Sequence, residues 1–179
     1  YVALKFLKPS YSINSQNKDK LLVEGRILEE LNKHPHIINV RAYIGKDEHH
    51  GAYLVLDYIA GQTLQSKHPK GIPIELPTVI HYVTQIASAL DYAHEHRILH
   101  RDLKQNNIMI TATQDIILLD FGLSIDETNS DFELPNGSSM GFPETMAPER
   151  WDYRSQRESD VYALGVIIFE LLTGQKLFE

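Results

Sequence analysis

The most specific signal in the sequence is the stretch His100-Arg101-Asp102-Leu103-Lys104-Gln105-Asn106-Asn107. It lies between a segment with helical spacing of apolar residues and a short apolar segment typical of a strand. Four fixed residues such as its His, Arg, Asp and Asn recur by chance in only about one window in 10^5. Phosphoryl transfer requires a carboxylate that accepts a hydroxyl proton, a cation that faces the phosphoryl group and an amide oxygen that holds a metal ion. Asp102, Lys104 and Asn107 supply these groups in that order.

Three further motifs surround this stretch in a fixed order. Asp120-Phe121-Gly122 follows an apolar strand expected at residues 116–119, which places a carboxylate where Mg²⁺ can bridge phosphate oxygens. Before both motifs stands Val2-Ala3-Leu4-Lys5, and after them stands Ala147-Pro148-Glu149. The tripeptide alone would mean little, but four motifs in this order form a specific signature.

With these motifs the sequence resembles the eukaryotic-type protein kinase family, serine/threonine branch, over essentially its whole length. The resemblance implies an α+β, protein-kinase-like bilobal fold. Its N-lobe, a sheet with one helix, would occupy residues 1–57, a hinge 58–61, and a mainly helical C-lobe 62–179. It also implies truncation at both ends, because the family's glycine-rich loop precedes the motif lysine and further C-lobe helices follow the last residues. We therefore expect a partial catalytic domain, inactive on its own.

The resemblance further implies an activity: transfer of the γ-phosphoryl group of Mg-ATP to a serine or threonine of a protein substrate. Asp102 would be the catalytic base and Lys104 the γ-phosphate contact. The magnesium ligands would be Asn107 and Asp120. Lysine at position 104 is the pattern of the serine/threonine branch, since tyrosine kinases place other residues between the base and the asparagine.

The nucleotide site implied by the resemblance draws on both lobes. Lys5 would hold the α- and β-phosphates and pair with Glu24, which explains an acid on an otherwise apolar helical face. Adenine would lie between Ala3 and Met109 and beside Leu56, which falls just before the hinge. It would also form hydrogen bonds with the backbone of Asp57 to Ile59. Taken alone, Lys5 and Glu24 could equally be an unrelated surface lysine and helix-face acid.

The resemblance also assigns supporting residues. An apolar spine that aligns the lobes would contain Leu28, Val40, His100 and Phe121. The carboxylate of Asp160 would anchor the His100-Arg101 backbone, although an acid following Ser159 is also what a helix start favours.

Three departures from the family pattern bear on function. Gln105 replaces a common proline, Thr145 replaces a common tyrosine, and Phe142 replaces a threonine that hydrogen-bonds the base and the nearby lysine. Phe142 keeps a second hypothesis open, a pseudokinase or scaffold without phosphotransfer. A third hypothesis is a small-molecule phosphotransferase of related fold; Ala147-Pro148-Glu149 together with Asp120-Phe121-Gly122 favours a protein substrate instead.

Regulation by phosphorylation is also implied. In this family an arginine placed like Arg101 often pairs with a phosphate on the loop between Asp120 and Glu149. Ser138 is the candidate site in that loop, with Thr128, Ser130 and Ser139 as alternatives. The alternative hypothesis, that Ser138 is an unmodified serine in a polar loop, fits the sequence about equally well.

Hydrophobic patterning predicts the elements in the first half of the chain. Residues 1–8 are expected to form a strand buried on at least one face and stopped by Pro9. A polar loop at residues 10–20 should lead into a helix that carries Leu21, Glu24, Leu28 and Leu31 and ends at His34-Pro35. Strands are expected at residues 40–44 and 52–58, with a turn at residues 45–51 between them and a break at Gly61.

In the second half, Ile80, Val83, Ala87 and Leu90 mark a long amphipathic helix that runs to about His96. Short strands are expected at residues 108–111 and 116–119, followed by a polar loop. The last helix, at residues 160–172, is apolar nearly all round and is therefore expected to be buried on every side.

Composition restricts the remaining classes. Seventeen basic against 24 acidic residues give a formal charge of −7 with no basic block, so nucleic acid is not expected as a partner. The chain has no cysteine, which excludes disulfides and thiolate metal sites. Its 9 histidines are scattered, so solvated histidine is a better default than a metal site. No signal peptide and no membrane segment are expected, and we predict a cytoplasmic location.

Overall fold

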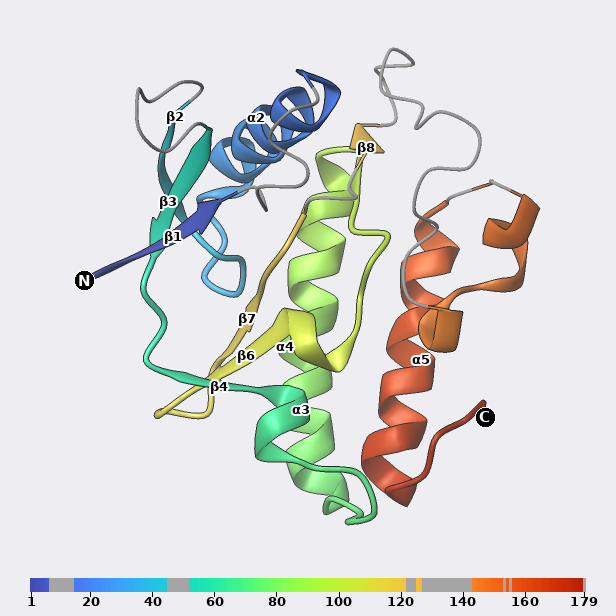
Figure 1. The fold of residues 1–179 in the computed structure, drawn as a ribbon. Helices are drawn as coiled ribbons and strands as arrows, with labels where there is room; N and C mark the ends of the chain where they lie inside the picture. The colour runs from blue at the N-terminus through green and yellow to red at the C-terminus, as the bar shows by residue number, and fades with distance from the viewer. Residues whose placement is uncertain are drawn as a thin grey trace.

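The computed structural model describes residues 1–6, 15–44, 52–121, 125–126, 143–152, 154 and 156–178. Strands and helices are mixed along the chain (Figure 1), which confirms the expected α+β class. The strands and helices are, in order, β1 (Val2–Phe6), α2 (Ser15–Leu31), β2 (Val40–Ile44), β3 (Tyr53–Asp57), β4 (Gly61–Thr63), α3 (Leu64–Lys67), α4 (Leu76–Glu95), β5 (Ile98–Leu99), β6 (Ile108–Thr111), β7 (Ile116–Leu118), β8 (Ile125–Asp126) and α5 (Arg157–Thr173). Short 3-10 turns are η1 (Gln105–Asn107), η3 (Pro143–Thr145) and η4 (Pro148–Asp152).

The first sheet has the order β1-β3-β2, with β3 antiparallel to both neighbours. Opposite Leu54 on β3 lies Lys5 of β1, which fixes the register that brings this lysine beside α2. Helix α2 packs against β2 and β3 (Figure 1), and the helix approaches the sheet closely at Gly25. The strands expected around residues 1–8, 40–44 and 52–58 are thereby confirmed.

Strand β1 differs from expectation in the face that it buries. Val2, Leu4 and Phe6 are all exposed, at 44%, 51% and 44% of their surface, whereas Ala3 and Lys5 are half-buried. The expected burial of at least one face is therefore only partial, because one face is half-buried and the other is exposed. Its inward face is the one that carries the lysine, because Lys5 has carboxylate partners there.

Helix α2 starts earlier than the apolar pattern indicated. It begins at Ser15, so residues 15–20 are helical and the expected polar loop is wrong for them. Apolar spacing marks only the part of a helix that packs on a core, and a polar turn can extend the helix without such packing. The packed part agrees with expectation: Leu21, Leu28 and Leu31 are buried, and the helix ends before His34-Pro35.

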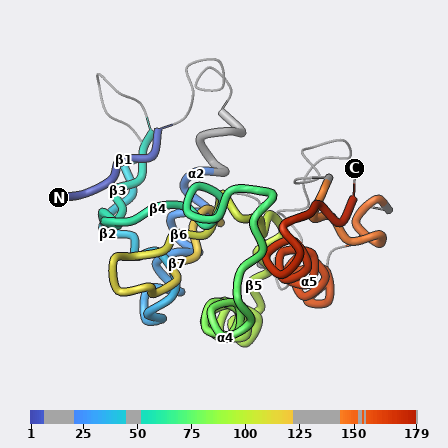
Figure 2. Tube along the Cα trace, turned by 90° about the horizontal axis from the view of Figure 1, so that it is seen from below, coloured from blue at the N-terminus to red at the C-terminus, as the bar shows by residue number. Residues whose placement is uncertain are grey.

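The second half of the chain is built on two long helices, α4 and α5, which lie side by side (Figure 2) and run antiparallel (Figure 1). At one end, the Ile74 N–H donates to the Leu171 carbonyl at 2.8 Å, and at the other, His94 of α4 meets Asp160 of α5. Helix α5 runs from Arg157, three residues earlier than expected, and Gly174 ends it in the left-handed conformation, at φ 70°. Such a residue after a helix is normally glycine because a Cβ is disfavoured there.

The buried face of α4 is not the one expected from its apolar residues. Ile80 is 54% exposed and Ala87 is exposed, while Leu90 is buried and Val83 half-buried. The buried side instead includes polar residues whose atoms are hydrogen-bonded, and polarity alone would have placed them outside. The fully buried set is Val79, Tyr82, Gln85, Ile86, Ala89, Leu90, Ala93 and His94.

Helix α5 is also less enclosed than expected. Val161 is 60% exposed and Leu172 is 36% exposed, so burial on every side is wrong for these residues. The helix buries Ala163, Val166 and Ile167 toward α4 and the η3 turn, which pack against it. An apolar residue on a helix is thus not by itself proof of burial.

The second half of the chain also contains short strands, one of which is bonded to the first half. A second sheet has the order β4-β6-β7, and β5 pairs with β8. Strands β4, β5 and β8 and helix α3 are absent from the sequence-based expectations, and β8 lies where a polar loop was expected. Strands β6 and β7 confirm the strands expected at residues 108–111 and 116–119. The Ile38 N–H donates to the Leu118 carbonyl at 2.9 Å, and the Leu118 N–H donates to the His36 carbonyl at 2.8 Å. The segment after α2 is therefore bonded directly to β7.

Within the described residues, no helix combines the length and the apolar character needed to cross a membrane.

Candidate active site

A cavity of about 410 Å³ lies between the first sheet and the strands β6 and β7. Its size suits a small organic ligand, since such sites commonly measure about 300–1,000 Å³. All the residues expected from the sequence to bind nucleotide or magnesium line it: Ala3, Lys5, Glu24, Leu56, Asp57, Ile59, Asn107, Met109 and Asp120. Tyr58, which lies within the expected backbone segment Asp57 to Ile59, also lines the cavity. Sequence reasoning did not single out the other lining residues as nucleotide-site residues, namely Leu4, Leu28, Ile38 and Leu119.

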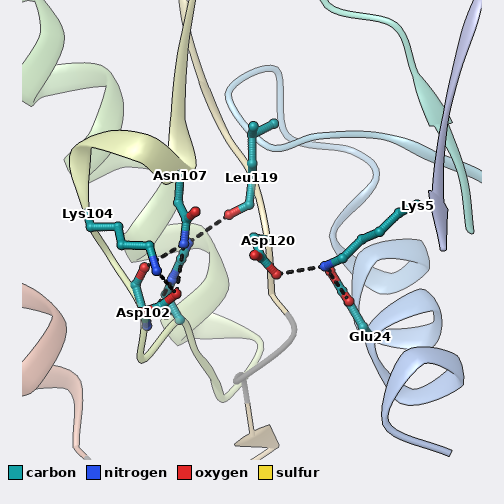
Figure 3. Close-up of polar contacts among 8 residues, drawn as sticks. Lys5, Glu24, Asp102, Lys104, Asn107, Leu119 and Asp120 are labelled. Carbon is teal, nitrogen blue, oxygen red and sulfur yellow. Dashed lines mark hydrogen bonds and ion pairs between the residues drawn. The ribbon is translucent and has the colours of Figure 1, made fainter. Parts of the chain in front are cut away.

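The charged floor of this cavity is an ion triplet (Figure 3). From β1, the Lys5 Nζ donates to both carboxylate oxygens of Glu24 on α2, at 2.7 and 2.8 Å. The same ammonium donates to Oδ1 of Asp120 at 2.7 Å. Three elements far apart in sequence therefore meet at one cation.

Burial and charge act in opposite directions on this triplet. Burial of the Lys5 ammonium would lower its pKa, but the carboxylates of Glu24 and Asp120 outweigh burial and hold the pKa above its ordinary value. Burial raises the pKa of Glu24, and Lys5 offsets this only in part. Glu24 is 3% exposed, so its negative charge depends on Lys5.

Asp102 is held by two neighbours in the turn that leads into η1. Its Oδ2 accepts hydrogen bonds from the Lys104 Nζ at 2.6 Å and from the Asn107 Nδ2 at 3.0 Å (Figure 3). The other oxygen, Oδ1, is buried and has no hydrogen-bond partner. A buried polar atom left without a partner is rare in proteins and is a mark of a functional group. The expected base and γ-phosphate contact thus lie together, and Asn107 connects them to the cavity.

His100 has a packing role and a hydrogen-bonding role, in line with its expected place in the spine. It is fully buried, and its ring lies 4.7 Å from that of Phe121. The Nδ1 atom accepts the Asp102 N–H at 3.3 Å, while Nε2 faces the Leu119 carbonyl at 3.1 Å. This arrangement requires a neutral ring with its proton on Nε2. The other spine residues, Leu28 and Val40, are buried in the same core.

Asp160 anchors the His100-Arg101 backbone, as the sequence predicted. Its Oδ2 accepts the His100 N–H at 2.9 Å and its Oδ1 accepts the Arg101 N–H at 2.9 Å. His94 also donates from Nε2 to Oδ2, at 2.8 Å. Burial alone would raise the pKa of Asp160, but the hydrogen bond from His94, the electrostatic effect of His100 and the hydrogen bonds from the two backbone groups outweigh burial and hold the pKa below its ordinary value. A histidine in the last turn of a helix gave no signal that it would reach Asp160.

The end of β3 is fixed at its last residue, Asp57. The side chain of Arg41 donates to Asp57 Oδ1, and Asn39 donates to Oδ2 at 3.2 Å. The Asp57 N–H donates to the Asn39 carbonyl at 3.0 Å, so its backbone nitrogen is engaged. Sequence reasoning missed both partners, because neither belongs to a motif.

Of the residues that depart from the family pattern, two are described. Gln105 is buried and donates from Nε2 to Oε2 of Glu170 at 2.7 Å, and Thr145 is 8% exposed. Several residues named in the sequence analysis lie outside the described ranges, namely Gly122, Thr128, Ser130, Ser138, Ser139, Phe142 and the turn at residues 45–51.

The donor set of the site suits a divalent cation such as Mg²⁺. Because the Asn107 Nδ2 donates to both the Asp102 carbonyl and Asp102 Oδ2, the amide oxygen is the atom left to accept a cation. Asp120 supplies a carboxylate on the same cavity, and Mg²⁺ prefers oxygen ligands of this kind. In the described ranges, no group of three or more His, Cys, Asp or Glu side chains is placed to hold a metal ion.

Comparison with known proteins gives a consistent result. A family model described as "Protein kinase domain" matches residues 1–179. The probable serine/threonine-protein kinase PknB of Lactococcus lactis is 32% identical over 180 residues, which cover 99% of this chain and 28% of that protein. The serine/threonine-protein kinase PrkC of Bacillus subtilis is 30% identical over 179 residues, 99% of this chain and 27% of that protein. The serine/threonine-protein kinase pkn3 of Myxococcus xanthus is 33% identical over 186 residues, 99% of this chain and 34% of that protein. The chain therefore spans about a third or less of the length of these relatives.

Proposed function

The chain belongs to the protein kinase domain family, and from this membership and the geometry of the cavity we propose that it transfers the γ-phosphoryl group of ATP to a serine or threonine hydroxyl of a protein. The three relatives named above are serine/threonine-protein kinases, which supports this acceptor class. Family membership also implies the use of a nucleotide triphosphate with a divalent metal ion.

One observation carries the proposal. The Lys5–Glu24–Asp120 triplet and Asn107, the partner of Asp102, line the same cavity. Phosphoryl transfer depends almost entirely on positioning and charge stabilisation, and therefore needs cations and a base on one cavity. A core of purely structural residues would not concentrate the carboxylates of Glu24, Asp57 and Asp120 and the ammonium of Lys5 on one cavity.

Asp102 acts as the base in this mechanism. Lys104 and Asn107 hold its Oδ2, so its Oδ1 keeps a fixed direction and an unused lone pair. This oxygen accepts the proton of the substrate hydroxyl while the hydroxyl oxygen bonds to the γ-phosphorus and the bond to the ADP oxygen breaks. The ammonium of Lys104, beside the base, faces the charge that is transferred.

Lys5 binds and orients the nucleotide phosphates. Glu24 holds the ammonium from one side through both carboxylate oxygens, which leaves the cation directed into the cavity. The adenine ring occupies the apolar part of the cavity, between Ala3 and Met109 and beside Leu56, and bonds to the backbone near Ile59. Asn107 and Asp120 would hold Mg²⁺, which supplies neutralisation of phosphate charge when bound.

The two-lobe division also belongs to this proposal. The lobe boundaries are residues 1–57, 58–61 and 62–179, with the middle segment as hinge. The first sheet ends at Asp57 and the next strand, β4, pairs with β6 of the other half, which supports a boundary at this point.

The test is a phosphotransfer assay on the intact protein with radiolabelled ATP and serine- or threonine-containing acceptor proteins. Asp102→Asn should remove most of the transfer and leave ATP affinity nearly unchanged, because the base acts in the chemical step. Lys5→Met should suppress transfer by losing the cation that orients the phosphates. Nucleotide binding without any transfer would instead indicate a pseudokinase, and transfer only to small molecules would indicate a small-molecule phosphotransferase.

A further inference from the structure

Arg150 is a buried cation that the proposed reaction does not use. It lies on the η4 turn and is only 7% exposed. Arginine is almost never this buried unless its guanidinium has a specific partner. Here the guanidinium donates from Nη1 to the backbone carbonyl oxygen of Arg101, 49 positions earlier in the chain.

The carbonyl that Arg150 holds belongs to a strained residue. Arg101 has φ 65°, in the left-handed region that side chains other than glycine disfavour. Such a conformation persists only where its surroundings fix it. Asp160 accepts the Arg101 N–H at 2.9 Å, and Arg150 binds the carbonyl at the other end of the same residue.

This carbonyl is joined rigidly to Asp102. The Arg101 C=O and the Asp102 N–H belong to one planar peptide unit, so neither can turn without the other. His100 Nδ1 accepts the Asp102 N–H at 3.3 Å on one edge of that plane, and Arg150 holds the opposite edge. Of these two bonds, the one to the charged guanidinium is the stronger type.

We propose that Arg150 is a positioning residue for the catalytic base: it fixes the peptide plane between Arg101 and Asp102 and thereby aims the Asp102 carboxylate at the substrate hydroxyl. This inference rests on the proposed function, in which Asp102 is the base. Without the guanidinium, the Arg101 carbonyl loses a charged donor, and the peptide plane is held less firmly. The Asp102 side chain then leaves the orientation in which its Oδ2 meets Lys104 and Asn107.

The charges around Arg150 support this role. Burial lowers the pKa of Arg150, while the carboxylates of Asp160, Asp102 and Glu149 oppose that effect. Burial, together with the charge of Arg150, also lowers the pKa of Arg101, to about 10. A buried cation beside a half-buried one costs free energy, which an apolar side chain at position 150 would avoid.

The support of Arg150 is shared with that of Asp160. Glu149, the residue before Arg150, accepts a hydrogen bond from the Ser159 hydroxyl in the first turn of α5, and the Arg150 N–H donates to the Ala147 carbonyl at 3.0 Å. Asp160 is the next residue of the same turn of α5. The first turn of α5 therefore holds both backbone groups of the strained Arg101. Asp160 binds its N–H directly, and Ser159 supports the Arg150 that binds its carbonyl through a hydrogen bond to the adjacent Glu149.

The experiment compares Arg150→Met, which keeps the length of the side chain without a donor, with Arg150→Lys, which keeps a charged donor on a buried stem. Arg26→Ala, a change of an exposed arginine on α2, is the control. Steady-state phosphotransfer, thermal unfolding and amide hydrogen exchange at Asp102 are measured in the intact protein. We expect Arg150→Met to lower kcat at least about tenfold, because small misplacements of a catalytic group have effects of this size. The KM for ATP should stay within about twofold.

The amide measurement and the lysine variant separate positioning from folding. Exchange at the Asp102 amide should accelerate in Arg150→Met, because its peptide plane is no longer held, while Arg150→Lys should recover most of kcat and of the protection. Equal kcat in the two variants, unchanged exchange at Asp102, or an unfolded Arg150→Met protein would overturn the inference. A wild-type protein that transfers no phosphoryl group would contradict the proposed function instead, and the exchange result would still decide whether Arg150 holds this peptide.

Discussion

Gly25 of α2 lies so close to Tyr43 of β2 that a Cβ placed on the glycine would come within 2.8 Å of the tyrosine Cβ. The same Cβ would lie 3.0 Å from Leu54 of β3. Real Cβ atoms do not approach neighbours this closely, so any larger residue must push the helix from the sheet. The position matters for function because Glu24, the partner of Lys5, is the adjacent residue.

We therefore predict that Gly25→Ala lowers the free energy of unfolding by about 1–3 kcal/mol, the usual cost of overpacking. It should also weaken ATP binding, because a displaced helix withdraws Glu24 from Lys5. Urea unfolding and nucleotide titration measure the two effects. Arg26→Ala, on the exposed side of the same helix, is the matched control. A Gly25→Ala protein as stable as this control would show that the helix and sheet can separate without cost.

A second prediction is that one substitution at Glu24 raises stability and lowers activity. Folding raises the pKa of this carboxyl through burial, so the folded state holds its proton more tightly than the unfolded state does. Its ionisation therefore costs stability as the pH rises above the unfolded value of about 4.3. Glu24→Gln removes that cost and should raise the free energy of unfolding at about pH 7, with the gain vanishing below about pH 4. Transfer activity should fall, because glutamine cannot hold the Lys5 ammonium by charge.

Denaturant unfolding across this pH range tests the idea, with Glu30→Gln as control, since Glu30 lies exposed on the same helix. A Glu24→Gln protein that is less stable than wild type at neutral pH would mean that the attraction to Lys5 exceeds the cost of burial.

Three features could be predicted from the sequence: the strands of the first sheet, the packed part of α2 and the residues around the cavity. Each of them depends on motif spacing or hydrophobic periodicity, which can be recognised within a short stretch of sequence. It did not predict the buried face of α4. Tyr82, Gln85 and His94 are buried there because the Tyr82 hydroxyl donates to Gln114 at 2.9 Å, Gln85 bonds to Ile116 and His94 bonds to Asp160. Such partners come from distant segments, and a period in one helix contains no information about them.

The contacts of Gln105 illustrate the same limit. Proline is common at this position in the family, and the sequence alone gave glutamine no role. In the structure its side chain is buried and binds Glu170 of α5 at 2.7 Å, which ties the catalytic turn to that helix. Glutamine at this position thus makes a hydrogen bond that proline could not make, and its partner is brought near only by the tertiary fold.

From this contact we predict that Gln105→Leu lowers the free energy of unfolding by about 1.5–3 kcal/mol, the range for a hydrogen bond to a charged group. Gln105→Pro should cost less. Lys104, the preceding residue, is extended at φ −158° and ψ 160°, as a residue before proline must be, and proline stabilises compatible positions by restricting the unfolded chain. Urea unfolding ranks the variants, and Asn106→Ala, at an exposed neighbour, should change little. If Gln105→Pro is the less stable of the two, the backbone at this position is not free to accept proline.

The last prediction concerns Asp160, whose carboxylate collects the His100 and Arg101 N–H groups and the His94 side chain. Asparagine has one acceptor oxygen, and its amino group would face donors that already point at this position. Asp160→Asn should therefore lower the free energy of unfolding at about pH 7 by about 3 kcal/mol. Hydrogen bonds hold the pKa of Asp160 below its unfolded value, so its stabilisation is present above about pH 4 and is lost as the pH falls through the folded pKa. The difference between wild type and Asp160→Asn should accordingly shrink in acid, which denaturant titrations at successive pH values can follow. A difference that stays constant down to the acid transition would assign the loss to packing rather than to charge. Transfer activity should fall in the same variant at neutral pH, because the strained Arg101, which precedes the proposed base Asp102, loses one of the two groups that hold it.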